Sequence, residues 1–367
     1  MVVNSVQHCV GGCKSRRSAG RNGVTSRSDR KMKRWARAAH LIRLAWAPAP
    51  RDVAPAIYRP HHYLHFELVP DYRSADGRVS HNSLGFRGPE VAHDKAPGTL
   101  RIACLGESTT YCTGLADNET WPQRLQARLA GRLPQPVEVI NAGVPGCISS
   151  EVLLAYIFKI EALAPDWVIY YFTVNDVNPR QLRSVSRDYR EYCRPWGSKP
   201  KLSSLNELET FLRHRHTLNY QIRNMFHVDH GEAYILRNTE RVFRANLRDL
   251  LALASAQSVR ALIVLPRYRR LTGSASDLEE PGRSADPKSW AVAQHRATAL
   301  AIARDHGQCV LDMIDRMPPP PWPDSARDDT GCYLDGIHLT ARGADLFAAQ
   351  VGEALCAQLG EAGEVAG

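Results

Sequence analysis

The sequence lacks a long uninterrupted apolar segment. None of its 367 residues fall in a run of about 18 apolar residues, so no transmembrane helix is predicted. Residues Met32 to Trp46 place basic residues before a short apolar segment, but Arg37 and Arg43 interrupt it, which argues against an export signal. An amphipathic helix on a membrane surface is the alternative that this pattern leaves open. We expect a cytoplasmic protein.

Cysteine pairs at metal-site or disulfide-framework spacing are also missing. The nine cysteines are an odd number, and Cys104, Cys147 and Cys309 lie in or beside apolar runs, where buried thiols are common. This usage favours a reducing compartment. The turn at Gly106–Thr110 is followed by no Gly-Lys-Ser/Thr, which excludes a phosphate-binding loop.

Several histidines lie close together in the middle of the chain without accompanying cysteines. The group comprises His214, His216, His227, Asp229 and His230. Structural zinc sites use defined sets of cysteine and histidine, so we interpret this segment as a solvated basic surface. We therefore predict no metal site in this segment.

Acidic residues are almost absent from the first 50 residues. This stretch holds 11 Lys/Arg and one acid, Asp29, which leaves 36 basic and 37 acidic residues in the rest of the chain. The formal net charge of +9 therefore belongs to the N-terminal part, which we interpret as a disordered arm over residues 1–51. A polyanion-binding arm is the alternative, and a start at Met32 instead of Met1 would remove most of it. We expect no nucleic-acid partner.

From Leu100 onward, short apolar runs alternate with amphipathic helical patterns. Such alternation is typical of a parallel sheet covered by helices. The predicted strands are Arg101–Leu105, Val137–Asn141, Trp167–Thr173, Ala261–Leu265 and Cys309–Met313. The sequence predicts an α/β fold, a three-layer α/β/α sandwich with a five-stranded parallel sheet. This domain spans residues 99–360 with an insertion at 177–235, a small β-rich segment over 52–98 precedes it, and 361–367 form a flexible C-terminus.

Polar residues follow four of the predicted strands. Ser108 follows the first strand, Gly146 the second and Asn175 the third, while Asp335 and His338 follow the fifth. Ligand sites of open parallel sheets form at the carboxyl ends of the strands. We therefore expect these residues to lie at one edge of the sheet.

These residue types suit acyl transfer by a serine nucleophile. A serine hydroxyl needs an adjacent base, and His338 has the right ordinary pKa for that role. Asp335 would accept a hydrogen bond from the other ring nitrogen and fix the tautomer. The backbone N–H groups of Ser108 and Gly146 and the side-chain amide of Asn175 would form an oxyanion hole.

Four ordered blocks resemble the SGNH (GDSL-type) hydrolase superfamily. They are Gly106-Glu107-Ser108, Asn141–Gly146, Val174-Asn175-Asp176 and Asp335-Gly336-Ile337-His338. The resemblance covers residues from about Leu100 to the last helix. It implies a flavodoxin-like sheet, a Ser–Asp–His triad and Ser, Gly and Asn oxyanion donors. It also implies esterase, thioesterase, lipase, deacetylase or acyl-transfer activity without a cofactor.

Two positions depart from the family pattern, and one is ambiguous. Glu107 stands where the family motif has Asp, which should alter the support of the turn. Thr173 stands where a Gly often precedes the Asn block, which should narrow the approach to Asn175. Gly143 competes with Gly146 for the oxyanion position, although Gly146 matches its block better.

The sequence predicts a serine esterase that hydrolyses a carboxylic ester through an acyl-Ser108 intermediate. A small-molecule or carbohydrate ester, with O-acetyl groups as the leading choice, is the expected substrate. Two alternatives remain, an O-acyltransferase with the same triad and a noncatalytic binding protein that keeps the fold. The sequence leaves the oligomeric state open.

Overall fold

The computed structural model describes residues 27–47, 57–193, 204–214, 235–268, 287–321 and 328–365. The chain forms two compact units. The smaller unit contains helix α1 (Arg27–Trp46) and nearly all of helix α5 (Leu205–His214). The larger unit contains every β-strand that the described residues form.

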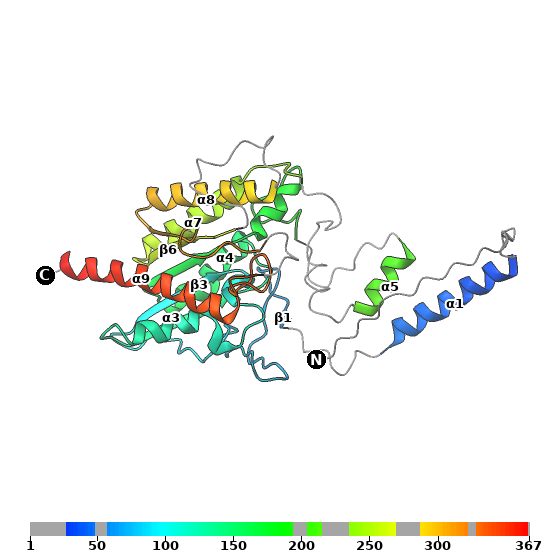
Figure 1. Ribbon diagram of the computed structural model, residues 1–367, viewed down its shortest axis with the longest axis horizontal. Helices are drawn as coiled ribbons and strands as arrows, with labels where there is room; N and C mark the ends of the chain where they lie inside the picture. The colour runs from blue at the N-terminus through cyan, green and yellow to red at the C-terminus, as the bar shows by residue number, and fades with distance from the viewer. Residues whose placement is uncertain are drawn as a thin grey trace, which may run out of the picture. The chain divides into compact units, whose positions relative to one another are not determined.

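A five-stranded parallel sheet forms the centre of the larger unit (Figure 1). Its strands are β3 (Leu100–Gly106), β4 (Val137–Gly143), β5 (Trp167–Tyr171), β6 (Arg260–Leu265) and β7 (Cys309–Asp312). Their order is β4-β3-β5-β6-β7, the doubly wound order of flavodoxin-like sheets. Strands β3 and β5 are buried along their whole length, which explains their nearly continuous apolar sequences.

Helices cover both faces of this sheet. Helices α3 (Trp121–Ala130) and α9 (Ala341–Val365) pack on one face. The other face is covered by α4 (Ser149–Ala155), α7 (Arg241–Ala256) and α8 (Pro287–Asp305). Successive residues of a strand point to opposite faces, so Ile102 packs on the α3 and α9 side and Ala103 on the other. The predicted three-layer sandwich is confirmed (Figure 1).

Short helical turns occupy the loops between these elements. They are helix α2 (Ser108–Tyr111), the 3-10 turns η1 (Asp117–Glu119), η3 (Glu161–Leu163) and η4 (Asn175–Gln181), and the π-helical turn η2 (Tyr156–Ile160). Helix α2 follows β3 and turn η4 follows β5, so both begin at the carboxyl edge of the sheet. This edge is where the predicted site residues come together.

Residues 57–98 form a small cap in the same unit as the sheet. Strands β1 (Tyr58–Arg59) and β2 (Glu67–Leu68) pair in antiparallel fashion. The Arg87 side chain is almost completely buried, and its guanidinium donates hydrogen bonds to the carbonyl oxygens of Tyr111, Cys112 and Leu115. The cap thus supplies donors for the backbone that leaves helix α2.

Several predicted boundaries differ from the helices that the structure describes. Helix α1 lies within residues 1–51, the predicted disordered arm, because its Ala-, Leu- and Arg-rich sequence favours a helix. Helix α9 continues to Val365, past the predicted end of the domain at residue 360. Parts of the predicted arm and insertion lie outside the described residues, namely 1–26, 194–203 and 215–234. The last range includes His216, His227, Asp229 and His230. The predicted domain limits remain predictions.

Candidate active site

The turn after β3 places Ser108 at the carboxyl edge of the sheet. A Cβ atom at Gly106 would lie 2.3 Å from both the Thr110 side chain and the Tyr171 carbonyl oxygen, so the strand can end this way only with glycine. Ser108 then begins helix α2 and is partly exposed. Ser108 is therefore held by a rigid turn and remains partly open to solvent.

Ser108, His338 and Asp335 form a continuous chain of hydrogen bonds. The Ser108 Oγ atom lies 2.9 Å from His338 Nε2, and His338 Nδ1 lies 2.7 Å from Asp335 Oδ2. The loop that carries Asp335 and His338 is closed by a 2.7 Å hydrogen bond from the Leu334 N–H to the His338 carbonyl. The fold brings together three residues that the sequence separates by up to 230 positions.

The Asp335 carboxylate is stabilised in its charged form. Burial alone would raise its pKa, but the hydrogen bond and the charge of His338 lower it, as do the N–H groups of His338 and Ile337. Both N–H groups donate to Asp335 Oδ1 at 2.8 Å. The net result is a pKa of about 2, so this group is ionised at neutral pH and can orient the imidazole.

The predicted oxyanion donors Ser108, Gly146 and Asn175 follow strands β3, β4 and β5. Within the described residues, the backbone N–H groups of Ser108 and Gly146 meet no acceptor. The Asn175 amide donates one hydrogen bond to the Cys147 carbonyl at 2.8 Å, which leaves its second N–H available. The Gly143 N–H is already bonded to Asn141 Oδ1, which leaves Gly146 as the better oxyanion candidate.

The two departures from the family pattern contact each other. The Thr173 hydroxyl donates to Glu107 Oε2 at 2.5 Å, and the Thr173 N–H donates to Glu107 Oε1 at 3.0 Å. Glu107 also accepts from the Asn175 N–H at 3.4 Å. Thr173 is buried with its hydroxyl on Glu107, and the expected narrowing of the approach to Asn175 stays a prediction. The longer acid and the added hydroxyl form one support beneath the Asn175 loop.

The carboxylates beneath the site are easier to protonate than Asp335. Burial raises the pKa of Glu107 to about 7 against the opposing hydrogen bonds from Thr173 and Asn175. Asp176 is also buried, and its pKa rises to about 6 although it accepts hydrogen bonds from Ser149 and Tyr189. Tyr189 belongs to the insertion, so Asp176 links the insertion to helix α4 next to the site.

The contacts of these supporting residues were not visible in the sequence. The blocks contain Glu107 and Asp176, but their partners lie 66 residues from Glu107 and 13 to 27 residues from Asp176. The one local signal was the pair of departures at Glu107 and Thr173. Strands β3 and β5 are neighbours with Gly106 opposite Tyr171, and that register brings the two departures together.

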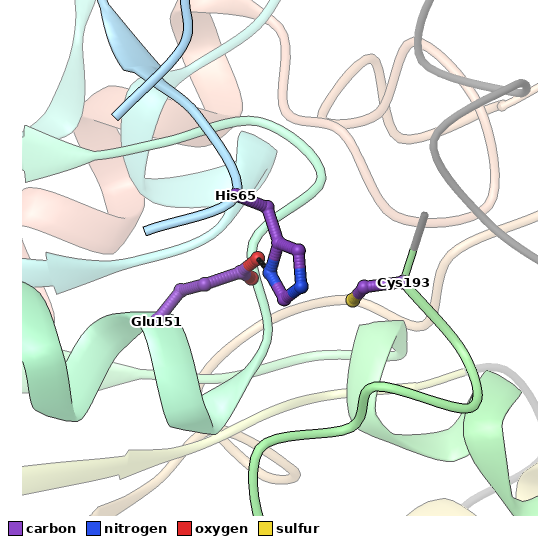
Figure 2. Close-up of side chains that lie close together, drawn as sticks. All are labelled: His65, Glu151 and Cys193. Atoms are coloured by element: carbon purple, nitrogen blue, oxygen red, sulfur yellow. Dashed lines mark hydrogen bonds and ion pairs between the residues drawn. The ribbon is translucent and has the colours of Figure 1, made fainter. Parts of the chain in front are cut away.

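A second cluster of potential metal ligands consists of His65, Glu151 and Cys193 (Figure 2). One donor atom from each residue lies within 4.8 Å of the others. However, Glu151 Oε1 is 2.6 Å from His65 Nδ1, and Glu151 Oε2 accepts a 2.8 Å hydrogen bond from the Ile148 N–H. Burial and the nearby charge of Glu151 raise the pKa of Cys193 far above its ordinary value, which keeps a proton on the sulfur. This donor set fits a hydrogen-bonded link between the cap and α4, with the Cys193 thiol beside it, better than a metal centre.

The fold and these residues define the class of SGNH hydrolases, in which the carboxyl edge of a flavodoxin-like sheet carries a serine and an Asp-x-x-His loop. The chain belongs to the GDSL-like Lipase/Acylhydrolase family, whose sequence model matches residues 104–346. It is accordingly a hydrolase that acts on esters. None of the curated proteins matches the chain.

Several solved structures are similar to the chain at low sequence identity. LAE5, an alpha/beta hydrolase from the metagenome of Lake Arreo, is 15% identical, with 69% of this chain and 94% of that chain covered and a TM-score of 0.42. The lipase/acylhydrolase from Enterococcus faecalis is 17% identical over 69% and 93%, with a TM-score of 0.42. The acetylxylan esterase Axe2 from Geobacillus stearothermophilus is 14% identical over 69% and 93%, with the same TM-score.

Proposed function

We propose that the chain is a serine esterase that cleaves a carboxylic ester through an acyl-Ser108 intermediate. The observation that carries this proposal is the hydrogen-bonded chain from Ser108 Oγ through His338 to Asp335, with distances of 2.9 and 2.7 Å. A base within hydrogen-bond reach of a partly exposed hydroxyl is the requirement for nucleophilic serine catalysis.

The first half of the reaction forms the acyl-enzyme. Ser108 Oγ attacks the ester carbonyl carbon while His338 Nε2 takes the hydroxyl proton. The negative charge of Asp335 stabilises the imidazolium that results. The tetrahedral intermediate then expels the alcohol, which receives the proton from Nε2, and the acyl group remains on Ser108.

The second half returns the free enzyme. A water molecule attacks the acyl carbon, His338 Nε2 takes one of its protons, and the second tetrahedral intermediate releases the carboxylic acid while Ser108 regains the proton. In both halves the charge develops on the former carbonyl oxygen. The N–H groups of Ser108 and Gly146 and the free N–H of Asn175 would donate to that oxygen.

We further propose a small-molecule or carbohydrate ester as the substrate, with an O-acetyl group as the first choice. Membership in an acylhydrolase family supports the ester bond as the common chemical element. A series of p-nitrophenyl esters from acetyl to long-chain acyl would test the acyl preference. A kcat/KM value that rises with chain length would contradict the acetyl assignment while leaving the esterase proposal intact.

Labelling with a fluorophosphonate probe tests the nucleophile directly. The wild-type chain should become covalently modified, and Ser108→Ala should not. Ser255→Ala is the matched control, because Ser255 is an exposed serine on helix α7, and it should label like the wild type. Equal labelling of Ser108→Ala and wild type, or no labelling of folded wild-type protein, would contradict the proposal.

A further inference from the structure

Helix α1 has one face covered by helix α5. The Arg37 guanidinium donates to Asn206 Oδ1, and His40 Nε2 lies 3.2 Å from Glu209 Oε1. Leu41, on the same side of α1, is 9% exposed. Residues 40 and 41 lie three and four positions after residue 37, so the three residues share one face of the helix.

The opposite face of α1 carries a stripe of exposed apolar side chains, which we call the tryptophan stripe. It consists of Met32, Trp35, Ile42 and Trp46. The spacings of three, seven and four residues align these side chains, and at about 100° per residue the stripe lies about 180° from the α5-facing side. Trp35 is 67% exposed, Ile42 60% and Trp46 86%, so α5, the other described helix of this unit, leaves the stripe uncovered.

The charge of α1 restricts what can cover this stripe. Between Met32 and Trp46 the sequence contains Lys33, Arg34, Arg37 and Arg43 and no acidic residue. By the same spacing Arg43 borders the stripe, whereas Arg37 lies on the α5-facing side. A second copy packed on the stripe would still place two basic helices side by side, which opposes self-association. An anionic surface that also accepts indole rings satisfies both the charge and the apolar stripe.

We propose that α1 binds the surface of an anionic lipid bilayer, with the tryptophan stripe inserted at the headgroup level. Trp prefers the boundary between headgroups and acyl chains, because its ring has an apolar body and one N–H donor. Long Arg and Lys side chains reach from such a helix to lipid phosphates. Among the described residues, no helix is long and apolar enough to cross a membrane, and the one-sided stripe fits a helix that lies in the interface.

Vesicle flotation with the full chain tests this proposal. Wild-type protein should float with vesicles that mix phosphatidylcholine and phosphatidylglycerol, and much less with phosphatidylcholine alone. The double variant Trp35→Ser/Trp46→Ser should lose at least about tenfold in the bound-to-free ratio, because two inserted indoles are removed. Lys33→Gln/Arg34→Gln should weaken binding and reduce its sensitivity to salt.

Leu205→Ser is the matched control for this experiment. Leu205 is also exposed and apolar but lies on α5, outside the tryptophan stripe, so its substitution should leave vesicle binding unchanged. Equal flotation of the tryptophan double variant and wild type would overturn the proposal, as would equal binding to neutral and anionic vesicles. If the wild-type protein bound no vesicles but formed a dimer, and the tryptophan double variant were monomeric, the stripe would be assigned to contact with a second copy instead. Fluorophosphonate labelling of both variants reports the esterase site separately.

Discussion

Two carboxyl groups support the site from different surroundings, and they differ in charge. Asp335 lies in a surface loop, accepts two backbone N–H groups and faces an imidazole, and its pKa falls to about 2. Glu107 is buried under the nucleophile turn and meets the neutral groups of Thr173 and Asn175, and its pKa rises to about 7. The pKa values of Asp335 and Glu107 therefore differ for two reasons. Asp335 has a partner that can carry a positive charge, and it is more accessible to solvent than Glu107.

This difference indicates a division of labour. A carboxylate that must stabilise an imidazolium has to remain charged, and the Asp335 loop provides for this. Glu107 instead holds the backbone in place through hydrogen bonds. A carboxyl group can accept such bonds with a much smaller preference for the charged form, because each bond acts over a short distance. The variants below test whether the chemistry of the site follows this division.

Asp335→Asn should reduce kcat more than any other variant considered for the two carboxyl groups. An amide cannot stabilise the imidazolium and favours the wrong imidazole tautomer, so kcat should fall about 10⁴-fold with little loss of stability. Initial rates on a p-nitrophenyl ester and thermal unfolding would measure the two effects. Asp345→Asn, which removes an exposed carboxylate on α9, is the control and should keep wild-type kcat. Only a few-fold loss in Asp335→Asn would remove this residue from the proposed triad.

Asn175→Ala tests the donor that Glu107 supports. Loss of one oxyanion donor typically reduces kcat about 10²–10³-fold, and KM should change little because the donor acts on the developing charge. Steady-state kinetics would separate the two parameters. A change confined to KM would assign Asn175 to ground-state binding instead.

Glu107→Gln and Thr173→Val examine the buried pair. Each single change should lower kcat roughly 10- to 100-fold by loosening the Asn175 loop, with substrate contacts untouched. A double-mutant cycle on unfolding free energies should give a coupling of roughly 0.5–3 kcal/mol, because the two side chains share a 2.5 Å hydrogen bond. Additive effects would show that the two departures act independently. Glu107→Asp in the Thr173→Gly background should recover more activity than either single change, if the family pattern is an equivalent solution.

The pH dependence of stability should carry opposite signs for the two carboxyl groups. Glu107 has a folded pKa of about 7 above its ordinary value of 4.5, so its ionisation costs stability as pH rises between these values, by roughly 3 kcal/mol at most. Asp335 stabilises the fold above its ordinary pKa of 3.8, and this contribution is lost as pH falls toward 2. Urea unfolding from pH 4.5 to 7 should show a flatter profile for Glu107→Gln than for wild type. An unchanged slope would exclude Glu107 as the source.

The sequence was informative where function requires a residue at the end of a strand. Ser108, Gly146, Asn175 and the Asp335 loop follow apolar runs, and parallel strands place their carboxyl ends at one edge, so their proximity could be predicted. The sheet and its helical layers were predictable for the same reason, since buried parallel strands and amphipathic helices leave strong patterns. The roles of the site residues stay predictions until the variants above are measured.

Other features depend on contacts that a linear pattern does not encode. The Glu107–Thr173 pair needs β3 and β5 to be neighbours, and the chain order of strands does not give their spatial order. Asp176 finds Tyr189 only when the insertion folds back onto helix α4. The placement of Arg87 requires a turn of the cap to pack against the end of helix α2, where the guanidinium donates to the Cys112 carbonyl oxygen. In each case the partner is chosen by tertiary packing.

Buried Arg87 connects the cap to the end of helix α2, the helix that Ser108 begins. Its guanidinium also meets Asp117 at 3.1 Å, so one cap residue neutralises a carboxylate and donates hydrogen bonds to three carbonyl oxygens. A chain shortened to begin at Leu100 would retain the whole family match at 104–346 but would leave those acceptors without their donor. The family match thus begins later in the chain than Arg87, and we expect a chain trimmed for crystallisation or fusion to need the cap as well.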